Sequence, residues 1–294
     1  MPHPVDAPTR PPSRAALRID AHQHFWHYDA AAYSWIDESM RAIRRDFLPS
    51  DLAPALAATG QDGTVAVQAR QSLAETEWLL QLSGTFPWIK GVVGWLPLAE
   101  QGAAIGRLLE HFGAHDRLKG VRHVLQAEPD AYFADPGFND ALGEVARAGL
   151  TYDLLIVARQ LPAALKWVDR HPTLRIVLDH IAKPAVDGAP SLAWRRDINE
   201  LARRPNLFCK FSGVVTEVPG WRWFPELVRP YFEVVLEAFG PERLMFGSDW
   251  PVCLLAADYP RWHAVVANLL LPLSPAERAA IMGGTATAAY RLES

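Results

Sequence analysis

Short apolar runs rich in valine, isoleucine and leucine alternate along this chain with longer amphipathic stretches. The short runs are nearly continuous, which is typical of strands buried on both faces of a parallel sheet. Between them, apolar residues recur at helical spacing, as at Leu161, Leu165 and Val168. The pattern predicts eight strands, at residues 17–25, 64–69, 89–96, 118–125, 151–157, 174–180, 207–212 and 243–248.

Glycine residues indicate where several of the intervening helices end. Glycine adopts the left-handed conformation of a helix C-cap without strain, so a glycine after a helical stretch predicts its last turn. Five glycines stand in such places, namely Gly60, Gly84, Gly113, Gly149 and Gly240. The resulting order is strand, helix, strand, helix throughout.

Eight strand and helix units in this order predict a parallel sheet covered by helices, and their number favours closure into a (β/α)8 barrel of the TIM type. Such a barrel needs about 250 residues, and the 294 residues of the chain provide them in a single domain at 17–294. A doubly wound open sheet is the alternative fold. Its glycine-rich phosphate loop would follow the first strand, where this chain has His-Gln-His at 22–24. Residues 1–16 contain five prolines and are expected to form an extended arm.

Composition and charge limit the kinds of partner. A formal net charge of −4, without a run of Lys or Arg, argues against a nucleic-acid surface. Apolar runs fall short of the ~20 residues that a spanning helix requires, and the first residues lack the apolar core of a signal peptide. We therefore expect a cytoplasmic protein whose partner is a small molecule rather than a membrane, with its oligomeric state left open.

Residues with catalytic or metal-binding chemistry stand at the ends of three predicted strands. Side chains alternate across a strand, so His22 and His24 point to the same side. His180 ends the sixth strand and Asp249 follows the eighth. In a (β/α)8 barrel the active site lies at the C-terminal ends of the strands. We therefore expect these four side chains to converge.

Five segments together resemble the amidohydrolase superfamily, and within it the sugar-lactone hydrolases, the branch that includes L-fuconolactonase and L-rhamnonolactonase. The segments are DAHQHFW at 20–26, GVVGW at 91–95, GVRH at 120–123, DHIAKP at 179–184 and FGSDWP at 246–251. The resemblance covers almost everything after the N-terminal arm. It implies hydrolysis of an L-fuconolactone-like aldonolactone to the open aldonic acid, a carboxylic-ester hydrolysis in L-fucose degradation.

The same resemblance bears on metal binding. Metal-dependent members place a further histidine after the fifth strand, and two-metal members add a bridging lysine after the fourth. Here residues 152–155 read YDLL and residues 121–124 read VRHV, so a binuclear centre is not expected. His22, His24 and Asp249, with His180 as a further candidate, can still hold one Zn²⁺ with open coordination positions. Because lactonases of this branch are able to work without metal, the ion is not expected to be required.

Hydrolysis of a ring ester needs a base for water, a positive group at the carbonyl oxygen and a proton for the departing alkoxide. Asp249 is the predicted base, since a carboxylate can take a proton from water and return it to the leaving oxygen. Arg122 and His180 are the predicted catalytic donors to the carbonyl oxygen, with His123, Lys183 or an ion on the histidine pair as alternatives. Seven further residues are predicted to contact the substrate by stacking or hydrogen bonding, namely Gln68, Trp26, Trp95, His123, Asp153, Lys183 and Trp250.

Structural roles compete with these functional ones. A lone histidine such as His180 is more often a hydrogen-bonded structural residue, and Asp249 before Trp-Pro could cap a turn. Arg122 could be a rim ion pair, and Lys183 a loop anchor. Asp20 could brace the two histidines from behind. Two other functions also stay open: a metal-dependent decarboxylase or dicarboxylate-lactone hydrolase of the same superfamily, and a non-catalytic barrel that binds sugar acids.

Overall fold

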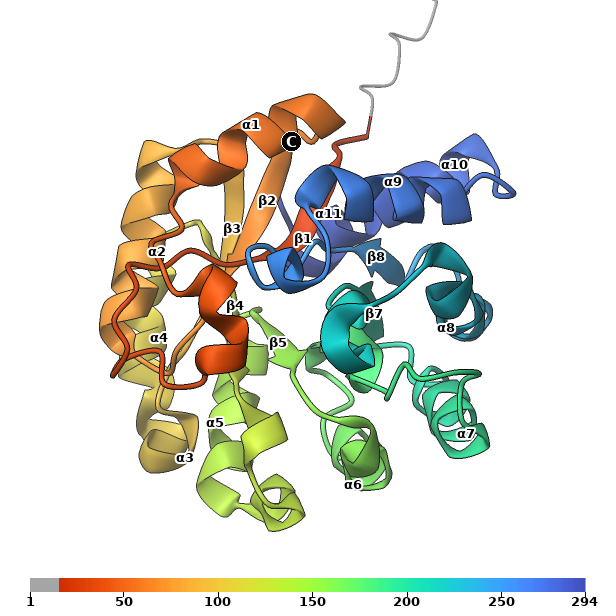
Figure 1. The fold of residues 1–294 in the computed structure, drawn as a ribbon. Helices are drawn as coiled ribbons and strands as arrows, with labels where there is room; N and C mark the ends of the chain where they lie inside the picture. Colours follow the sequence, from red (N-terminus) through yellow and green to blue (C-terminus); the bar gives the residue numbers. More distant parts are fainter. Residues whose placement is uncertain (1–15, 294) are drawn as a thin grey trace, which may run out of the picture.

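The structure is a computed structural model that describes residues 16–293, so the arm predicted at 1–16 lies, except for Ala16, outside the described residues. One eight-stranded sheet follows the order of the chain, and each strand pairs in parallel with the next (Figure 1). The strands are β1 (Ile19–Gln23), β2 (Gly63–Val67), β3 (Ile89–Gly94), β4 (Leu118–His123), β5 (Thr151–Leu154), β6 (Arg175–Leu178), β7 (Leu207–Phe211) and β8 (Leu244–Phe246).

The last strand returns to the first. Just beyond β8, the Asp249 N–H donates to the His22 carbonyl at 2.8 Å, and the His24 N–H donates to the Trp250 carbonyl at 2.7 Å. These bonds bring the ends of β1 and β8 together, so the sheet is a nearly closed (β/α)8 barrel in one domain. The predicted barrel is confirmed, and the open-sheet alternative is wrong.

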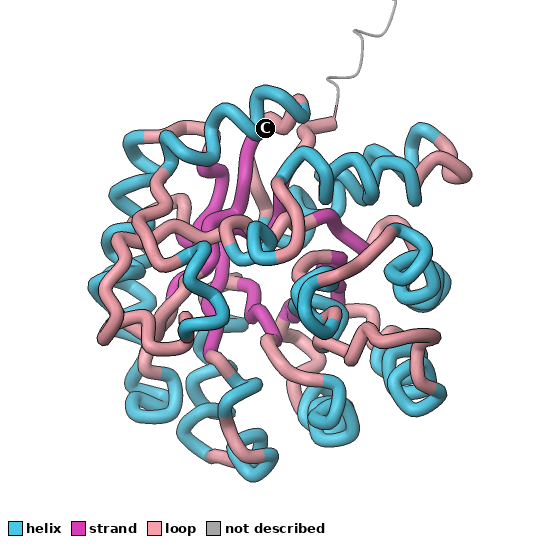
Figure 2. The backbone as a smooth tube through the Cα atoms, in the orientation of Figure 1, coloured by secondary structure: helices cyan, strands magenta, loops and turns pink. Residues whose placement is uncertain are grey.

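Helices surround the strands as an outer ring (Figure 2). The helices are α1 (Pro49–Thr59), α2 (Leu73–Thr85), α3 (Leu98–Gln101), α4 (Gly106–Gly113), α5 (Pro136–Arg147), α6 (Leu161–Val168), α7 (Leu192–Leu201), α8 (Pro225–Phe239), α9 (Tyr259–Leu269), α10 (Pro275–Ala279) and α11 (Thr285–Tyr290), the last of which lies at one end of the barrel and not in the ring. One core cluster lies between the strands and this ring. A second lies inside the barrel, where α11 contributes Ala286, Ala289 and Tyr290 beside Ile19. The last helix thus seals the end of the barrel at which the strands begin.

Three of the five glycines predicted to end helices have a left-handed φ, namely Gly60 (66°), Gly149 (73°) and Gly240 (68°). The prediction is wrong for the other two. Helix α2 continues through Gly84 to Thr85, and Gly113 is the last residue of α4 without a left-handed φ. A glycine within a helix costs only about 1 kcal/mol relative to alanine, so packing can carry the helix past it.

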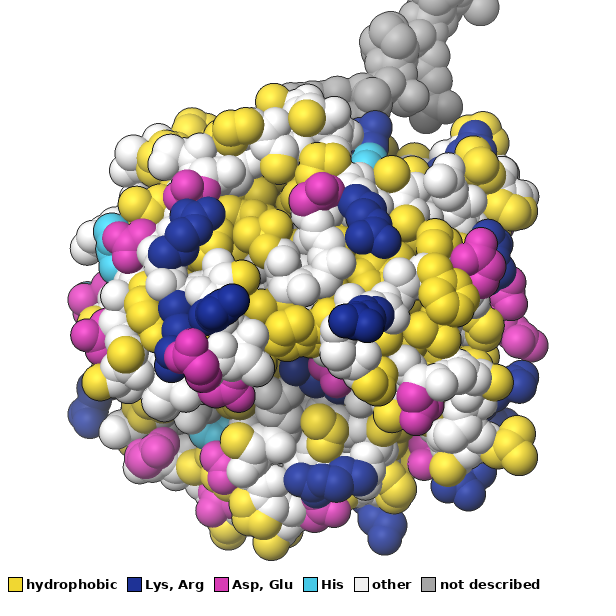
Figure 3. Space-filling model, viewed as in Figure 1, with side chains coloured by type: hydrophobic (Ala, Val, Ile, Leu, Met, Phe, Trp, Pro, Cys, Tyr) yellow, Lys and Arg dark blue, Asp and Glu magenta, His cyan; other side chains and the backbone are white. Residues whose placement is uncertain are grey.

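The strands also end earlier than their apolar runs predicted. Beyond Gln23, Gly94 and Leu154, apolar residues continue into loops that pack under the C-terminal face. On the face seen in Figure 3, acidic and basic side chains are interspersed and do not form one basic patch. Among residues 16–293, every helix is too short or too polar to cross a bilayer.

Candidate active site

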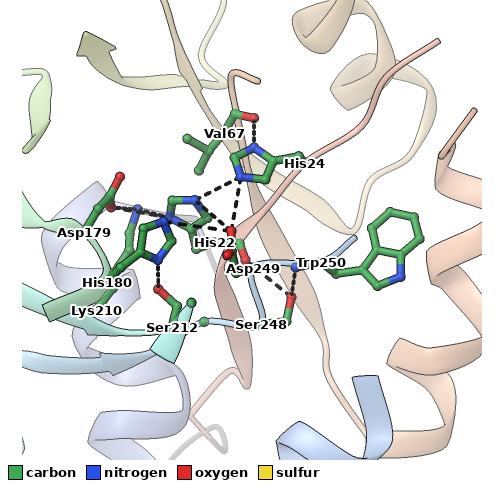
Figure 4. Close-up of polar contacts among 12 residues, drawn as sticks. His22, His24, Val67, Asp179, His180, Lys210, Ser212, Ser248, Asp249 and Trp250 are labelled. Carbon is green, nitrogen blue, oxygen red and sulfur yellow. Dashed lines mark hydrogen bonds and ion pairs between the residues drawn. The ribbon is translucent and has the colours of Figure 1, made fainter. Parts of the chain in front are cut away.

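Four polar side chains converge at the C-terminal end of the barrel, as the strand ends predicted (Figure 4). The Asp249 Oδ1 lies 3.4 Å from His24 Nε2 and 3.8 Å from the Nε2 atoms of His22 and His180. All four residues are buried. One carboxylate oxygen, from the segment after β8, therefore faces three imidazole rings: two from β1 and the residue that follows it, and one from the turn after β6.

Strand alternation accounts for the pair on β1. His22 and His24 point to the site, whereas the intervening Gln23 points away and its amide donates to Thr64 Oγ1 at 3.1 Å. Behind them, one oxygen of Asp20 accepts from the His22 N–H at 3.1 Å and from the Ser248 N–H at 2.8 Å. Asp20 thus ties β1 to the segment that carries Asp249. Burial raises the pKa of Asp20 to about 6.

Hydrogen bonds fix the orientation of two of the rings. His24 Nδ1 lies 2.8 Å from the Val67 carbonyl, which only accepts, so this nitrogen carries the proton and Nε2 presents a lone pair to the site. His180 Nδ1 lies 2.9 Å from Ser212 Oγ. Burial lowers the pKa of His180 to about 4, so its ring is neutral near pH 7.

Asp249 is held as a carboxylate. Burial alone would raise its pKa, but the neighbouring imidazoles of His180, His24 and His22 together hold the pKa well below its ordinary value. The residue also has a left-handed φ of 58°, a conformation that costs an ordinary residue about 1–2 kcal/mol. The fold therefore maintains an ionised acceptor in a strained position, which is common at functional sites.

The donor set fits one divalent metal ion. Ligands around a tetrahedral Zn²⁺ at about 2.1 Å lie about 3.4 Å from one another, and His22 Nε2, His24 Nε2 and Asp249 Oδ1 are 3.2 to 3.8 Å apart. His24 already presents its free Nε2. His22 can do the same only with its proton on Nδ1, which lies 3.3 Å from Asp179 Oδ1, and not when Nδ1 accepts from the Lys210 ammonium at 3.1 Å.

A fully buried ionic network lies beneath this cluster, and the sequence analysis did not identify it. The Lys210 ammonium is 2.5 Å from Asp153 Oδ2, 3.0 Å from Asp179 Oδ1 and 3.1 Å from His22 Nδ1. Arg122 Nη1 donates to the other oxygen of Asp179 at 3.0 Å. Burial would raise the pKa of Asp179, but Lys210, His22 and Arg122 hold it well below its ordinary value. The signal in the sequence was a lysine inside the apolar strand 207–211.

A cavity of about 300 Å³ opens above the cluster. Five of the predicted site residues line it, namely His24, Arg122, His180, Lys183 and Asp249. Its other walls come from loops to which the sequence analysis assigned no role in the site. They include apolar side chains at Trp35, Met40, Leu155, Val252 and Leu255, and polar ones at Gln126, Thr216 and Glu217. The cavity therefore has a polar floor and largely apolar walls.

A left-handed turn places two of these residues. His180, Ile181, Ala182 and Lys183 have φ angles of 52°, 50°, 62° and 46°. Two hydrogen bonds hold the turn: Lys183 N–H donates to the His180 carbonyl at 2.8 Å, and the Trp194 indole donates to the Ile181 carbonyl at 3.0 Å. Left-handed conformations cost about 1–2 kcal/mol for each such residue. The surrounding packing compensates for this strain and aims both His180 and Lys183 at the cavity.

Most of the predicted substrate contacts lie elsewhere, and of the seven only Lys183 lines the cavity. The aromatic side chains of Trp26 and Trp250 pack against Phe47 in the layer between strands and helices. Trp95 lies on the α2 side of β3, where its N–H bonds to Thr76 Oγ1.

The polar residues among the seven predicted substrate contacts form hydrogen bonds with other residues of the protein. His123 stacks on Tyr132 and bonds to Glu128. Gln68 lies behind Arg122 and accepts from its guanidinium. Asp153 lies deep in the barrel, bonded to Lys210 and to the Tyr290 hydroxyl. A prediction from position near a strand end could not decide which of these side chains reach the open side.

Comparisons with known proteins agree with this architecture. The family model described as amidohydrolase matches residues 19–292. An L-fucono-1,5-lactonase of Burkholderia multivorans is 42% identical, with 94% of this chain and 97% of the relative covered. One of Burkholderia ambifaria, of the same name, is 38% identical, with 94% and 96% covered. A crystal structure of an amidohydrolase from Burkholderia multivorans with bound zinc superposes with a TM-score of 0.88 at 40% identity, covering 95% of this chain and 100% of that one.

Proposed function

This chain belongs to the amidohydrolase family, and we propose that it hydrolyses a sugar lactone of the L-fucono-1,5-lactone type to the open aldonic acid. It is accordingly a hydrolase of a carboxylic ester, and its partner is a small neutral sugar lactone. The names of the two close relatives fit this reaction better than decarboxylation, dicarboxylate-lactone hydrolysis or binding without turnover.

The observation that carries the proposal is an ionised Asp249 at the floor of a small cavity. Its carboxylate lies against three histidines and is buried, yet it lines open space that a ligand can enter. At about 300 Å³ the cavity is at the small end of the range for small-molecule sites. Its floor supplies the base, and its walls can hold a compact ring.

In the proposed reaction Asp249 accepts a proton from the attacking water, whose oxygen forms the new bond to the lactone carbonyl carbon. The ring C–O bond then breaks, and the proton on Asp249 passes to the departing ring oxygen as the alcohol of the open acid. No covalent intermediate with the protein is needed. The carboxylate is regenerated, so Asp249 serves as base and then as acid.

Arg122 and His180 are the proposed donors to the oxygen that gains negative charge. Both line the cavity next to Asp249, and the guanidinium of Arg122 is held by Asp179 and by Gln68. Donors fixed before the reaction are effective because they need no reorganisation as charge develops. Lys183 reaches the same cavity from the end of the left-handed turn.

We propose that His22, His24 and Asp249 hold one zinc ion when it is available, and that hydrolysis does not depend on it. A bound ion would polarise the carbonyl and acidify water. A lactone is already an activated ester, so the proposed donors of the chain suffice for turnover.

The test is a pH-indicator assay with purified protein and a panel of lactones, including L-fucono-1,5-lactone, L-rhamnonolactone and a neutral hexono-1,4-lactone. We expect acid release well above the rate in buffer for at least one neutral aldonolactone. Rates no faster than buffer across the panel, from folded protein with and without added Zn²⁺, would refute the proposed function.

A further inference from the structure

The cavity wall contains a carboxylate that the reaction does not use. Glu217, in the 3-10 turn Val214–Glu217 after β7, lines the cavity and lies with Oε1 3.5 Å from the Lys183 ammonium. Their side chains are 25% and 23% exposed. The Val186 N–H donates to the Glu217 carbonyl at 3.3 Å, which ties the loop after β6 to the loop after β7. The pair is therefore part of the cavity and not a contact of outer surface side chains.

We propose that Glu217 determines specificity: by pairing with Lys183 at the cavity wall, its carboxylate excludes lactones that carry a negative charge and favours neutral sugar lactones. This inference rests on the proposed function and names the class of lactone that the same site accepts. Glu217 contacts the substrate space and not the reacting atoms. It is a specificity residue rather than part of the proton transfer.

The charges around the cavity support this role. Of the described residues that line it, two carry cationic side chains, Arg122 and Lys183. The Arg122 guanidinium is bound to the carboxylate of Asp179 and to Gln68. Lys183 is bound to Glu217. A carboxylate on a substrate would therefore find the positive charges of both side chains already balanced by carboxylates of the protein.

Repulsion adds to this lack of a partner. An anionic substituent would lose water on entering a partly enclosed cavity, which is costly unless an opposite charge replaces the water. It would also meet the carboxylates of Asp249 and Glu217, which line the same space. Juxtaposed like charges are a common means of rejecting the wrong ligand. A neutral lactone has none of these costs, and its hydroxyls can donate to Glu217 and accept from Lys183.

The test compares kcat/KM for two lactones in each variant: a neutral aldonolactone, and an aldaric-acid monolactone such as glucaro-1,4-lactone that carries a carboxylate. In Glu217→Gln, Lys183 loses its partner and can bind the carboxylate, so the anionic-to-neutral ratio should rise about tenfold or more. In Lys183→Gln, Glu217 is left unpaired, and the ratio should fall below that of the wild type. The double variant should lie between the two.

Glu128→Gln is the matched control. Glu128 is also paired with a basic side chain, at 3.0 Å from His123 Nε2, and is 29% exposed, but it does not line the cavity. Glu128→Gln removes the same charge from the same face of the barrel, so its anionic-to-neutral ratio of kcat/KM should stay at the wild-type value. A ratio that rises equally in Glu128→Gln and Glu217→Gln would overturn the inference, because net charge alone would then explain it.

A binding measurement separates the inference from the proposed function. Calorimetric titration with the open aldarate dianion, which needs no turnover, should show affinity about tenfold higher in Glu217→Gln than in wild type. Equal affinities, or a wild type that prefers the anionic lactone, would overturn the role of Glu217. Wild-type protein that hydrolyses no neutral lactone, whatever the variants bind, would instead refute the proposed function.

Discussion

Replacing Asp249 by asparagine tests the central step of the proposed reaction. Asparagine has nearly the same shape, and the Asp249 backbone carbonyl still accepts from the Cys253 N–H at 2.9 Å. The substitution removes the negative charge and the ability to take a proton. The remaining cavity, including His180 and Arg122, keeps its shape, so substrate can still enter.

The size of the loss follows from the role of the carboxylate. A positioned general base contributes about 10²–10⁴-fold in rate, which corresponds to about 3–5 kcal/mol of transition-state stabilisation. Asp249 is buried and ionised, with its carboxylate 3.4 Å from His24 Nε2. Asparagine cannot replace this function, because its amide oxygen is too weak a base. We therefore expect kcat/KM to fall by at least about 10²-fold, with the decrease mainly in kcat.

The assay is acid release from a neutral aldonolactone, followed with a pH indicator and corrected for hydrolysis in buffer. Thermal unfolding of each variant shows whether a loss of rate reflects a loss of fold. Asp46→Asn is the matched control. Asp46 also pairs with a histidine, His27, at 2.9 Å, but both side chains are more than half exposed and lie outside the cavity lining.

Asp46→Asn should keep the wild-type rate. A folded Asp249→Asn protein that retains kcat/KM within about threefold of wild type, well above the loss expected for a general base, would refute the role of Asp249. A loss matched by the control would show that the rate depends on general surface charge.

Three further predictions concern the surroundings of the cluster. Burial raises the pKa of Asp20 from 3.8 to about 6. Its contribution to the free energy of unfolding is therefore present below pH 4 and falls by about 3 kcal/mol as the pH rises through 6. In urea unfolding, Asp20→Asn should make the free energy of unfolding less dependent on pH between 4 and 6, and an unchanged dependence would contradict the assignment. Gly213 has a φ of 66°, and an added Cβ would lie 2.5 Å from His180 Nδ1; Gly213→Ala should therefore lower kcat/KM while Gly143→Ala, with open space around it, should not. Protein stripped with a chelator should retain hydrolysis of a neutral lactone, and a complete loss restored by Zn²⁺ would show that the ion is required.

The sequence predicted the barrel and the convergence of its histidine–aspartate cluster because both follow from strands. Near-continuous apolar runs indicate buried parallel strands, and side-chain alternation places His22 and His24 on one side. Closure then brings the ends of the first and last strands together, which is how Asp249 comes to lie 3.4 Å from His24. The positions of these residues follow from the order of the strands and the alternation of side chains along each strand alone.

The remaining walls of the cavity could not be predicted in this way. Trp35, Leu155 and Glu217 come from separate loops, and their orientation depends on packing between segments far apart in the chain. Trp26, another predicted contact, does not line the cavity, for the same reason. Its ring is turned into the layer between strands and helices, where it packs on Tyr33 and Phe47. A place near a strand end puts a residue at the C-terminal end of the barrel. It does not decide in which direction the side chain of a loop residue points.

The buried network beneath the cluster could be predicted only in part. A lysine within an apolar strand is costly unless it is paired, so Lys210 alone implied at least one buried carboxylate. Its partners, Asp153 and Asp179, lie on β5 and at the end of β6, whose side chains face the barrel interior beside β7. Register between neighbouring strands is what brings them together, and register was not predicted. The same network contacts His22 from below, so the geometry of the histidine–aspartate cluster depends on the barrel interior. In the proposed function, specificity depends on the loops above the cluster, so substitution of Glu217 should change the preferred lactone without altering the proposed reacting groups.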